Sequence, residues 1–537
     1  MKIKSLKFIL VLILIIFFFY LINIFNFPKG NLKEGKIISL IPPAIAISLA
    51  IILKEVYLSL FLGIFSGFLI LNDFKFYKAI ESTLMDGLVK NLANNDHSSI
   101  VIFTLFLGGM VGIIYKNGGM EGLVLKLRKI ARERRSAQIS GWLMGIIIFF
   151  DDYANTLLVG NTLRPLTDFY KISREKLSYI VDSTAGPVTS IAIISTWIGY
   201  EISLISDSFK NLGIDENAYI FFIRTIPFRF YPIFCLFFGF LIASTLRDFG
   251  PMLKAEKRAY KEGKLTRDGA NPLGFTKIEK IEPSSPLLAI IPILFVFFGC
   301  FIMLYITGVQ NLGRISKIKE IISASDSFKA LTISSFFGLS VAFFLSLFKF
   351  KIKEIMDGLF DGFKAMLSAI AILILAWALY TVCQNLGTST YIANLTKTYI
   401  SPYLIPSFIF LSACFISFAT GTSWGSLAVL VPIAIEVSVK TQSKEILFLS
   451  CAAVLSGSIF GDHISPISDT TILSSLSSSC DHIDHVSTQA PYGILCAFVS
   501  LFIGVIPTSF GFPLIFSLIL GSFLLWLCLF LFGKKVY

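Results

Sequence analysis

A polar stretch interrupts one of the apolar segments of the C-terminal half and reads Gly461-Asp462-His463-Ile464-Ser465-Pro466-Ile467-Ser468-Asp469-Thr470-Thr471. It comes shortly after the apolar run 446–455, where a continuous membrane-spanning helix would otherwise be expected. Glycine and proline break a helix and free backbone carbonyls, while Ser, Thr and Asp add hard oxygen ligands that suit a cation such as sodium. The stretch therefore predicts a broken helix with an ion site at the break.

The composition places this stretch in a membrane protein. Of 537 residues, 55% are hydrophobic and only 15% are charged, whereas about 25% of the residues of a soluble domain are charged. A soluble globular protein is excluded, and the apolar residues suffice for about 12 spans of about 20 residues each. One of the predicted spans covers residues 366–384. The formal net charge is +12, and the basic residues lie mainly in short connections, which is the positive-inside pattern. We predict an all-α polytopic membrane protein.

The N-terminal half carries a second polar segment with a proline, which reads Asp182-Ser183-Thr184-Ala185-Gly186-Pro187-Val188-Thr189-Ser190. Residues 187–195 align without gaps with residues 466–474, and an aspartate precedes each proline. Two further pairs of segments match each other at one common offset, namely 59–63 with 334–338 and 84–88 with 359–363. The chain therefore consists of two repeats, and each repeat is predicted to contain a helix broken near its proline.

Each repeat also contains a predicted re-entrant hairpin. The segment 139–160 is flanked by basic connections at both ends, so it enters and leaves the membrane on one side. It contains Phe149-Phe150-Asp151-Asp152-Tyr153-Ala154-Asn155-Thr156, and adjacent carboxylates cannot face lipid. The segment 404–438, which Thr420-Gly421-Thr422-Ser423-Trp424-Gly425 interrupts, is the predicted second hairpin and opens from the opposite face.

Five spans and one hairpin per repeat make an odd number of crossings, so the second repeat is inverted relative to the first, as is usual in secondary transporters. Together with the spans, this predicts two inverted repeats with re-entrant hairpins and broken helices. The predicted organisation is an anchor helix at 1–30 that starts in the cytoplasm, a first repeat at 38–244, a cytoplasmic linker at 245–284, a second repeat at 285–508, and an extra helix with a basic tail at 509–537.

The candidate site residues come from the two polar segments and the two hairpin tips. A carboxyl group held away from water favours its protonated form, so a proton competes with a metal cation for the same oxygens. Asp462 and Asp469 are the preferred candidates because hydroxyl-bearing and ionisable neighbours surround both. The predicted cation- or proton-binding residues are Asp462, Asp469, Ser465, Ser468, Thr470, Asp182, Ser183, Thr184, Asp151 and Asp152, and the predicted substrate contacts of the hairpins are Asn155, Thr156, Thr422 and Ser423.

Structural roles stay open for several of these groups. The segments 462–471 and 420–425 could serve only close helix packing, because small residues let backbones approach. Asp151 and Asp152 could form the cytoplasmic end of the hairpin, and Asp182 could be the partner of a basic residue.

Histidine and cysteine add no metal or redox site to these predictions. Asp481-His482-Ile483-Asp484-His485 resembles a ligand cluster but lies in a short connection and lacks the H-E-x-x-H spacing of a metalloprotease, so we predict a solvated or pH-responsive loop. His463 alone is a candidate neighbour of the proton site. The eight cysteines form no C-x-x-C pair. We expect no catalytic residue, no cofactor and no metal beyond sodium.

The polar motifs resemble a known family. Residues 461–475 look like the signature of the NhaC-type sodium/proton antiporters, which belong to the ion transporter superfamily of inverted-repeat carriers. Residues 150–155, 182–188 and 420–425 support this resemblance, which covers roughly residues 38 to 508.

The resemblance implies sodium-coupled secondary transport in a prokaryotic inner membrane, with sodium ions, protons and the lipid bilayer as partners and no nucleic acid. A homodimer is compatible with it. The leading hypothesis is an exchanger of sodium for protons that works by alternating access. The alternative is a sodium- or proton-coupled carrier of a small organic anion or amino acid, similar to malate and lactate exchangers. An enzyme is not expected. A channel is disfavoured because no selectivity loop is recognisable.

Overall fold

The computed structural model describes residues 36–53, 56–128, 132–272, 282–388, 391 and 401–536. Within these ranges the chain is helical apart from its connections and one antiparallel pair of two-residue strands, β1 (Arg247–Asp248) and β2 (Lys534–Lys535). The predicted anchor helix at 1–30 lies outside the described residues.

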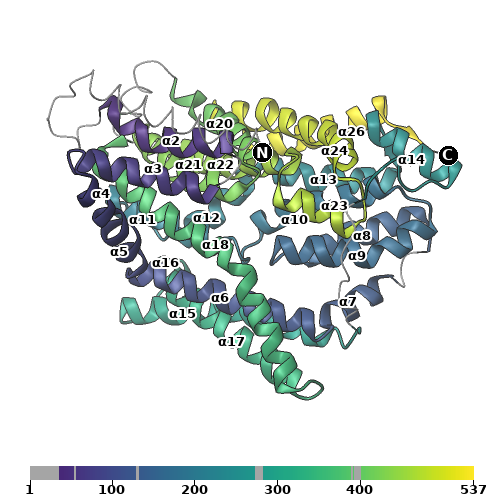
Figure 1. Ribbon diagram of the computed structural model, residues 1–537, viewed down its shortest axis with the longest axis horizontal. Coiled ribbons are helices and arrows are strands. Elements are labelled where there is room, and N and C mark those ends of the chain that lie inside the picture. The colour runs from purple at the N-terminus through teal and green to yellow at the C-terminus, as the bar shows by residue number, and fades with distance from the viewer. Residues whose placement is uncertain are drawn as a thin grey trace.

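The helices follow the same order in both halves, with apolar helices first, then a hairpin and a broken helix (Figure 1). The first half contains α2 (Ile41–Leu53), α3 (Val56–Leu71), α4 (Phe76–Ser82), α5 (Lys90–Leu92), α6 (Asn95–Lys116), α7 (Gly119–Arg128), α8 (Arg134–Ile147), α9 (Asp152–Phe169), α10 (Arg174–Ile191), α11 (Ile198–Leu212), α12 (Ala218–Thr225) and α13 (Phe230–Thr245). The remainder contains α14 (Gly250–Glu262), α15 (Leu287–Leu312), α16 (Ile318–Ser323), α17 (Ser327–Leu347), α18 (Ile352–Leu386), α20 (Ile405–Thr420), α21 (Ser423–Val439), α22 (Lys444–Ile464), α23 (Asp469–Ser477), α24 (His482–Val499), α25 (Ile506–Ser509) and α26 (Leu514–Phe532).

The described residues include eight helices that are long and apolar enough to cross a membrane, and α12 with α13 form a ninth if their 50° bend lies within one span. The shorter apolar helices at 37–50 and 57–71 and the broken pair α10–α11 add to these. The inventory agrees with the predicted all-α protein of about 12 spans, and the chain is a multi-pass membrane protein.

Both predicted hairpins are present as two helices joined at a tip. In the first, α8 ends at Ile147 and α9 begins at Asp152, because the side chain of Asp151 accepts the N–H of Ala154 and caps α9. In the second, α20 ends at Thr420, and the next residue, Gly421, has a φ of +73° and reverses the chain at little steric cost.

Both predicted broken helices are present, but the first break is not at the proline. In the second half, α22 ends at Ile464 and α23 begins at Asp469, with Pro466 between them. In the first half, Pro187 lies inside α10, and the break follows at 192–197. Proline removes only one helical hydrogen bond there, and the carbonyl of Ser183 that it frees is approached by the Cys235 thiol at 3.8 Å. The prediction of a break within 182–190 was therefore wrong by a few residues.

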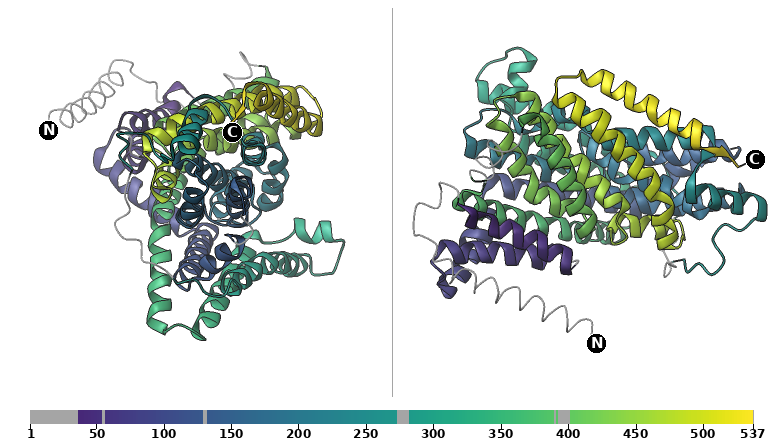
Figure 2. Two further views of the ribbon diagram at one scale, coloured as in Figure 1. Left: turned by 90° about the vertical axis from the view of Figure 1, so that its right-hand side faces the viewer. Right: turned by 90° about the horizontal axis from the view of Figure 1, so that it is seen from above.

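A second group of helices packs beside the hairpins and broken helices. The long helix α18 crosses α6 at a contact between glycines, since a Cβ atom added to Gly112 would lie 2.1 Å from the carbonyl oxygen of Gly358. α17 packs on α6 and on α15, so these helices lie together along one side of the molecule (Figures 1 and 2).

The predicted linker at 245–284 is folded over much of its described length. Glu256 on α14 accepts hydrogen bonds from the Arg134 guanidinium and, at 2.8 Å, from the backbone N–H of Ser173. Arg258 on the same helix donates to both carboxylate oxygens of Glu175, at 2.8 and 2.9 Å. This segment therefore covers the N-terminal ends of α8 and α10.

Candidate ion-binding site

The tip of each hairpin contacts the break of its own half. In the first half, the N–H of Thr196 donates to the carbonyl of Phe150 at 2.9 Å. In the second half, the hydroxyl of Ser465 donates to the carbonyl of Phe418 at 2.7 Å, and Gly421 packs directly on the carbonyl of Ile467. The non-helical backbone of each tip therefore lies against the break of its own half, and residues at both tips and next to both breaks line one cavity.

Three buried oxygens around the first tip meet no partner at normal hydrogen-bond geometry among the described residues, and two of them belong to side chains that interact with each other, Asp151 and Thr196. They are Oδ2 of Asp151, Oδ1 of Asn155 and Oγ1 of Thr196, and their residues are at most 4% exposed. The amide nitrogen of Asn155 fixes that side chain by donating to the carbonyls of Gly145 at 2.7 Å and Ile148 at 3.0 Å. A carboxylate, an amide and a hydroxyl oxygen are ligand types that hard cations prefer, and a bound cation or a water molecule would satisfy such buried oxygens.

Asp462 is held by hydroxyl groups alone. Ser423 on the second hairpin donates to its Oδ2 at 3.0 Å, and Ser468 in the second break donates to its Oδ1. The hydroxyl of Thr470 lies 3.1 Å from that of Ser468. No ion pair among the described residues involves Asp462, so its charge lacks a basic partner there.

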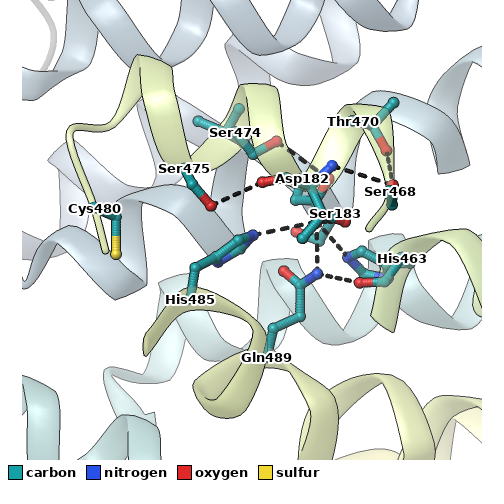
Figure 3. A network of polar contacts seen from close by, with 12 residues as sticks. Asp182, Ser183, His463, Ser468, Thr470, Ser474, Ser475, Cys480, His485 and Gln489 are labelled. Atoms are coloured by element: carbon teal, nitrogen blue, oxygen red, sulfur yellow. Dashed lines mark hydrogen bonds and ion pairs between the residues drawn. The ribbon is translucent and has the colours of Figure 1, made fainter. Parts of the chain in front are cut away.

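Asp182 lies in a denser network that connects α10, α23 and α24 (Figure 3). Its carboxylate accepts hydrogen bonds from the hydroxyls of Thr471 and Ser474, both at 3.1 Å, and from the amide of Gln489 at 2.6 Å. The Nε2 atom of His485 lies 3.3 Å from the same carboxylate.

The interpretation of residues 481–485 as a solvated loop was wrong. Asp481 caps α24 and the helix begins at His482, so His485 lies one turn into the helix and is fully buried. The helical spacing of His485 and Gln489 puts both side chains on one face, toward Asp182. That i, i+4 spacing is the signal in the sequence that relates these two residues to each other.

A cavity of about 380 Å³, here called the vestibule, lies between the hairpin tips and α18. Asp152 and Asp469 both line it, and the Tyr153 hydroxyl donates to Asp469 at 3.2 Å. Thr422 and Trp424 of the second hairpin also face the vestibule. The full lining comprises Tyr57, Asp151, Asp152, Tyr153, Leu157, Thr196, Lys364, Ala365, Met366, Ala369, Ile372, Thr422, Trp424, Asp469 and Leu473.

Four predicted site residues instead donate hydrogen bonds from their hydroxyls to backbone carbonyls. Thr184 donates to Ile180 at 2.8 Å and Thr156 donates to Tyr153 at 2.8 Å, each within its own helix. The remaining two are Ser183, which donates to Ile180, and Ser465, which joins the second break to the second hairpin. The residues that the sequence analysis did not identify are Tyr153, Thr196, Thr471, Ser474, His485 and Gln489.

The sequence matches the profile of the Na+/H+ antiporter family over residues 188–507. A Haemophilus influenzae protein described as uncharacterized is 31% identical over 493 residues, which cover 89% of this chain and 91% of that protein. A Bacillus subtilis protein named malate-2H(+)/Na(+)-lactate antiporter is 29% identical over 188 residues, which cover 32% of this chain and 39% of that protein.

Among solved structures, the fold resembles that of the YdaH transporter from Alcanivorax borkumensis. The TM-score is 0.52 with 14% sequence identity, and the match covers 82% of this chain and 90% of that one. At this identity the likeness concerns the fold alone.

Proposed function

We propose that this chain, which belongs to the Na+/H+ antiporter family and is a secondary transporter, exchanges sodium ions for protons at the meeting point of the hairpin tips and the breaks. The observation that carries the proposal is the set of three unpaired buried oxygens around the first tip, on Asp151, Asn155 and Thr196. A sodium ion bound there would supply the missing partner of each oxygen and neutralise the Asp151 carboxylate.

The proton would reside on Asp462. This carboxylate has hydroxyl partners but no basic partner among the described residues. A charge that crosses the low-dielectric core of a membrane needs compensation, and bound sodium ions or protons can provide it here. Sodium/proton exchange follows if the site switches its opening from one face of the membrane to the other only when a sodium ion or a proton is bound.

Alternating access would move the tips and breaks together relative to α6 and α18. The tips and breaks are joined by hydrogen bonds within each half, while α18 forms the opposite wall of the vestibule. We place the protein in the prokaryotic cell membrane with its basic connections on the cytoplasmic side.

The test is a flux assay in proteoliposomes that contain an internal pH dye. Sodium added outside should enter in exchange for protons, and the interior should become alkaline. Asp462→Asn should abolish this signal, whereas Asp268→Asn, in an exposed loop pair with Lys264, should leave it unchanged. A full signal from Asp462→Asn would refute the assignment of the proton, and its absence from the wild-type protein would refute sodium/proton exchange.

A second candidate function is a sodium- or proton-coupled carrier of a small organic solute. The vestibule favours it, because its volume of about 380 Å³ lies in the range of small-molecule sites and far exceeds the need of a sodium ion. A partial relative is named for malate and lactate exchange. In this case the pH dye would respond only after an organic solute is added.

A further inference from the structure

The charged side chains around the vestibule are mostly acidic. Asp151, Asp152 and Asp469 line it, and Lys364 is the one basic residue among its described lining residues. Lys364 already pairs with Asp361 at 3.3 Å. The vestibule therefore has an excess of negative charge that its own lysine does not compensate.

A second cavity of about 280 Å³ adjoins the vestibule and continues this pattern. Its charged lining residues are Asp151, Asp361 and Lys116. The two cavities share the lining residues Asp151, Tyr153, Leu157, Ala365 and Met366. Asp151 therefore lies at the boundary between the two cavities, and its Oδ2 atom is buried and unpaired.

Asp469 is the carboxylate that is open to the vestibule. It is exposed, whereas Asp151 and Asp152 are buried. Among the described residues, its carboxylate accepts a hydrogen bond from the Tyr153 hydroxyl at 3.2 Å. Asp469 and Asp152 are the first residues of α23 and α9, so their own carboxylates already offset the positive ends of those helices, which would otherwise favour an anionic solute.

Aromatic rings form the wall next to Asp469. Tyr153 and Trp424 both line the vestibule. The Trp424 ring is fixed by Trp197 at 5.6 Å and Tyr200 at 4.8 Å between ring centroids. Aromatic faces attract cations and also cover the methylene groups of a flexible chain.

We propose that the vestibule binds a small organic solute through a protonated amino group, with the ammonium on Asp469 and the carbon chain against Tyr153 and Trp424. This inference rests on the second candidate function, the carrier of a small organic solute, because it names the chemical class of that cargo. It selects an amine or amino acid over a dicarboxylate for the organic cargo. No covalent step is involved.

The test uses three probes of equal chain length that differ in charge, which are 1,5-diaminopentane, 1,5-pentanediol and glutarate. The purified full-length protein is titrated with each probe, and the thermal unfolding midpoint is recorded. The diamine should raise the midpoint and the other two probes should not. Asp469→Asn should weaken the apparent affinity for the diamine by about tenfold, which corresponds to the loss of about 1.4 kcal/mol. Asp268→Asn serves as the control and should not change it.

Any of three results would overturn the proposal: stabilisation by glutarate in place of the diamine, no stabilisation by any probe, or an unchanged affinity for the diamine in Asp469→Asn. The sodium-driven pH signal is measured on the same preparation. A lost pH signal with intact diamine binding counts against sodium/proton exchange. An intact pH signal without diamine binding counts against the ammonium site alone.

Discussion

Arg229 is a fully buried cation beside the first break, and replacing it with methionine should strongly destabilise the protein. Its guanidinium donates to Glu201 at 3.0 Å, to the Thr225 hydroxyl at 3.1 Å and to the carbonyl of Ser190 in the last turn of α10. It also lies 4.5 Å above the ring of Phe222. Arg229→Met keeps an apolar stem in this space and removes all of the hydrogen bonds and the charge.

The expected loss of stability in Arg229→Met follows from the Glu201 carboxylate, which loses its partner. The side chain of Glu201 is 2% exposed, so the variant contains a buried carboxylate without a cation, and breaking a buried ion pair in this way costs about 3–5 kcal/mol. Glu201→Gln in the same chain removes the stranded charge. Because the two residues are in contact, their effects are not additive, and the double variant should regain about 1–3 kcal/mol relative to Arg229→Met.

The assay is thermal unfolding of the purified variants in detergent. Arg224→Met is the matched control, since Arg224 pairs with Glu216 at 2.8 Å in an ion pair whose side chains are 47% and 22% exposed, and such surface pairs contribute about 0–1 kcal/mol. The expected order of midpoints is wild type and Arg224→Met highest, the double variant lower, and Arg229→Met lowest. An Arg229→Met midpoint equal to that of the control would refute the reasoning. So would a double variant less stable than Arg229→Met.

Three further changes test other contacts. Gly112→Val should separate α6 from α18 and lower the unfolding midpoint, because its Cβ would lie 2.1 Å from the Gly358 carbonyl, whereas Gly299→Ala, with its nearest neighbour at 3.4 Å, should have little effect. Asn155→Leu removes the donor to three carbonyls at the first tip, so the stabilisation of the wild type by sodium in a thermal unfolding assay should disappear; persistence of that stabilisation would contradict the proposed sodium site. Arg258→Ala should loosen α14 and speed its cleavage in limited proteolysis, because it removes both hydrogen bonds to buried Glu175, and equal cleavage rates would show that α14 does not depend on this contact.

The first hairpin could be predicted because its signal is local. Basic connections on both sides of 139–160 and the adjacent Asp151 and Asp152 conflict with a simple span, and only a re-entrant segment resolves the conflict. The extent of α18 was less accessible. It begins at Ile352, whereas the apolar run begins at 366, because its first turns are stabilised by glycine contacts with α6 that hydropathy does not detect.

The position of the first break and the Asp182 network could not be predicted, because both depend on contacts between residues that are far apart in the sequence. Pro187 marks a helix breaker in the sequence, yet α10 continues past it, and the chain leaves the helix where Thr196 can bond to the tip of the first hairpin. His485 lies 303 residues from Asp182, so no local pattern relates the two. The position of the break and the burial of the histidine depend on residues far away in the sequence. Those partners are known only from the folded structure.

The structure orders three of the five candidate carboxylates, Asp182, Asp462 and Asp151, by how completely their oxygens are satisfied, which the sequence could not do. Asp182 accepts three hydrogen bonds and also faces His485, so it has the least need of a bound ion. Asp462 has two hydroxyl donors and no cation. Asp151 uses one oxygen to cap α9 and leaves the other buried and unpaired. Because an unsatisfied buried charge is the most costly arrangement, a cation should bind first at Asp151, and Asp462 should be neutralised next. By the same reasoning we propose that Asp182 holds α10 against α23 and α24 and that the exchanged ions bind at Asp151 and Asp462.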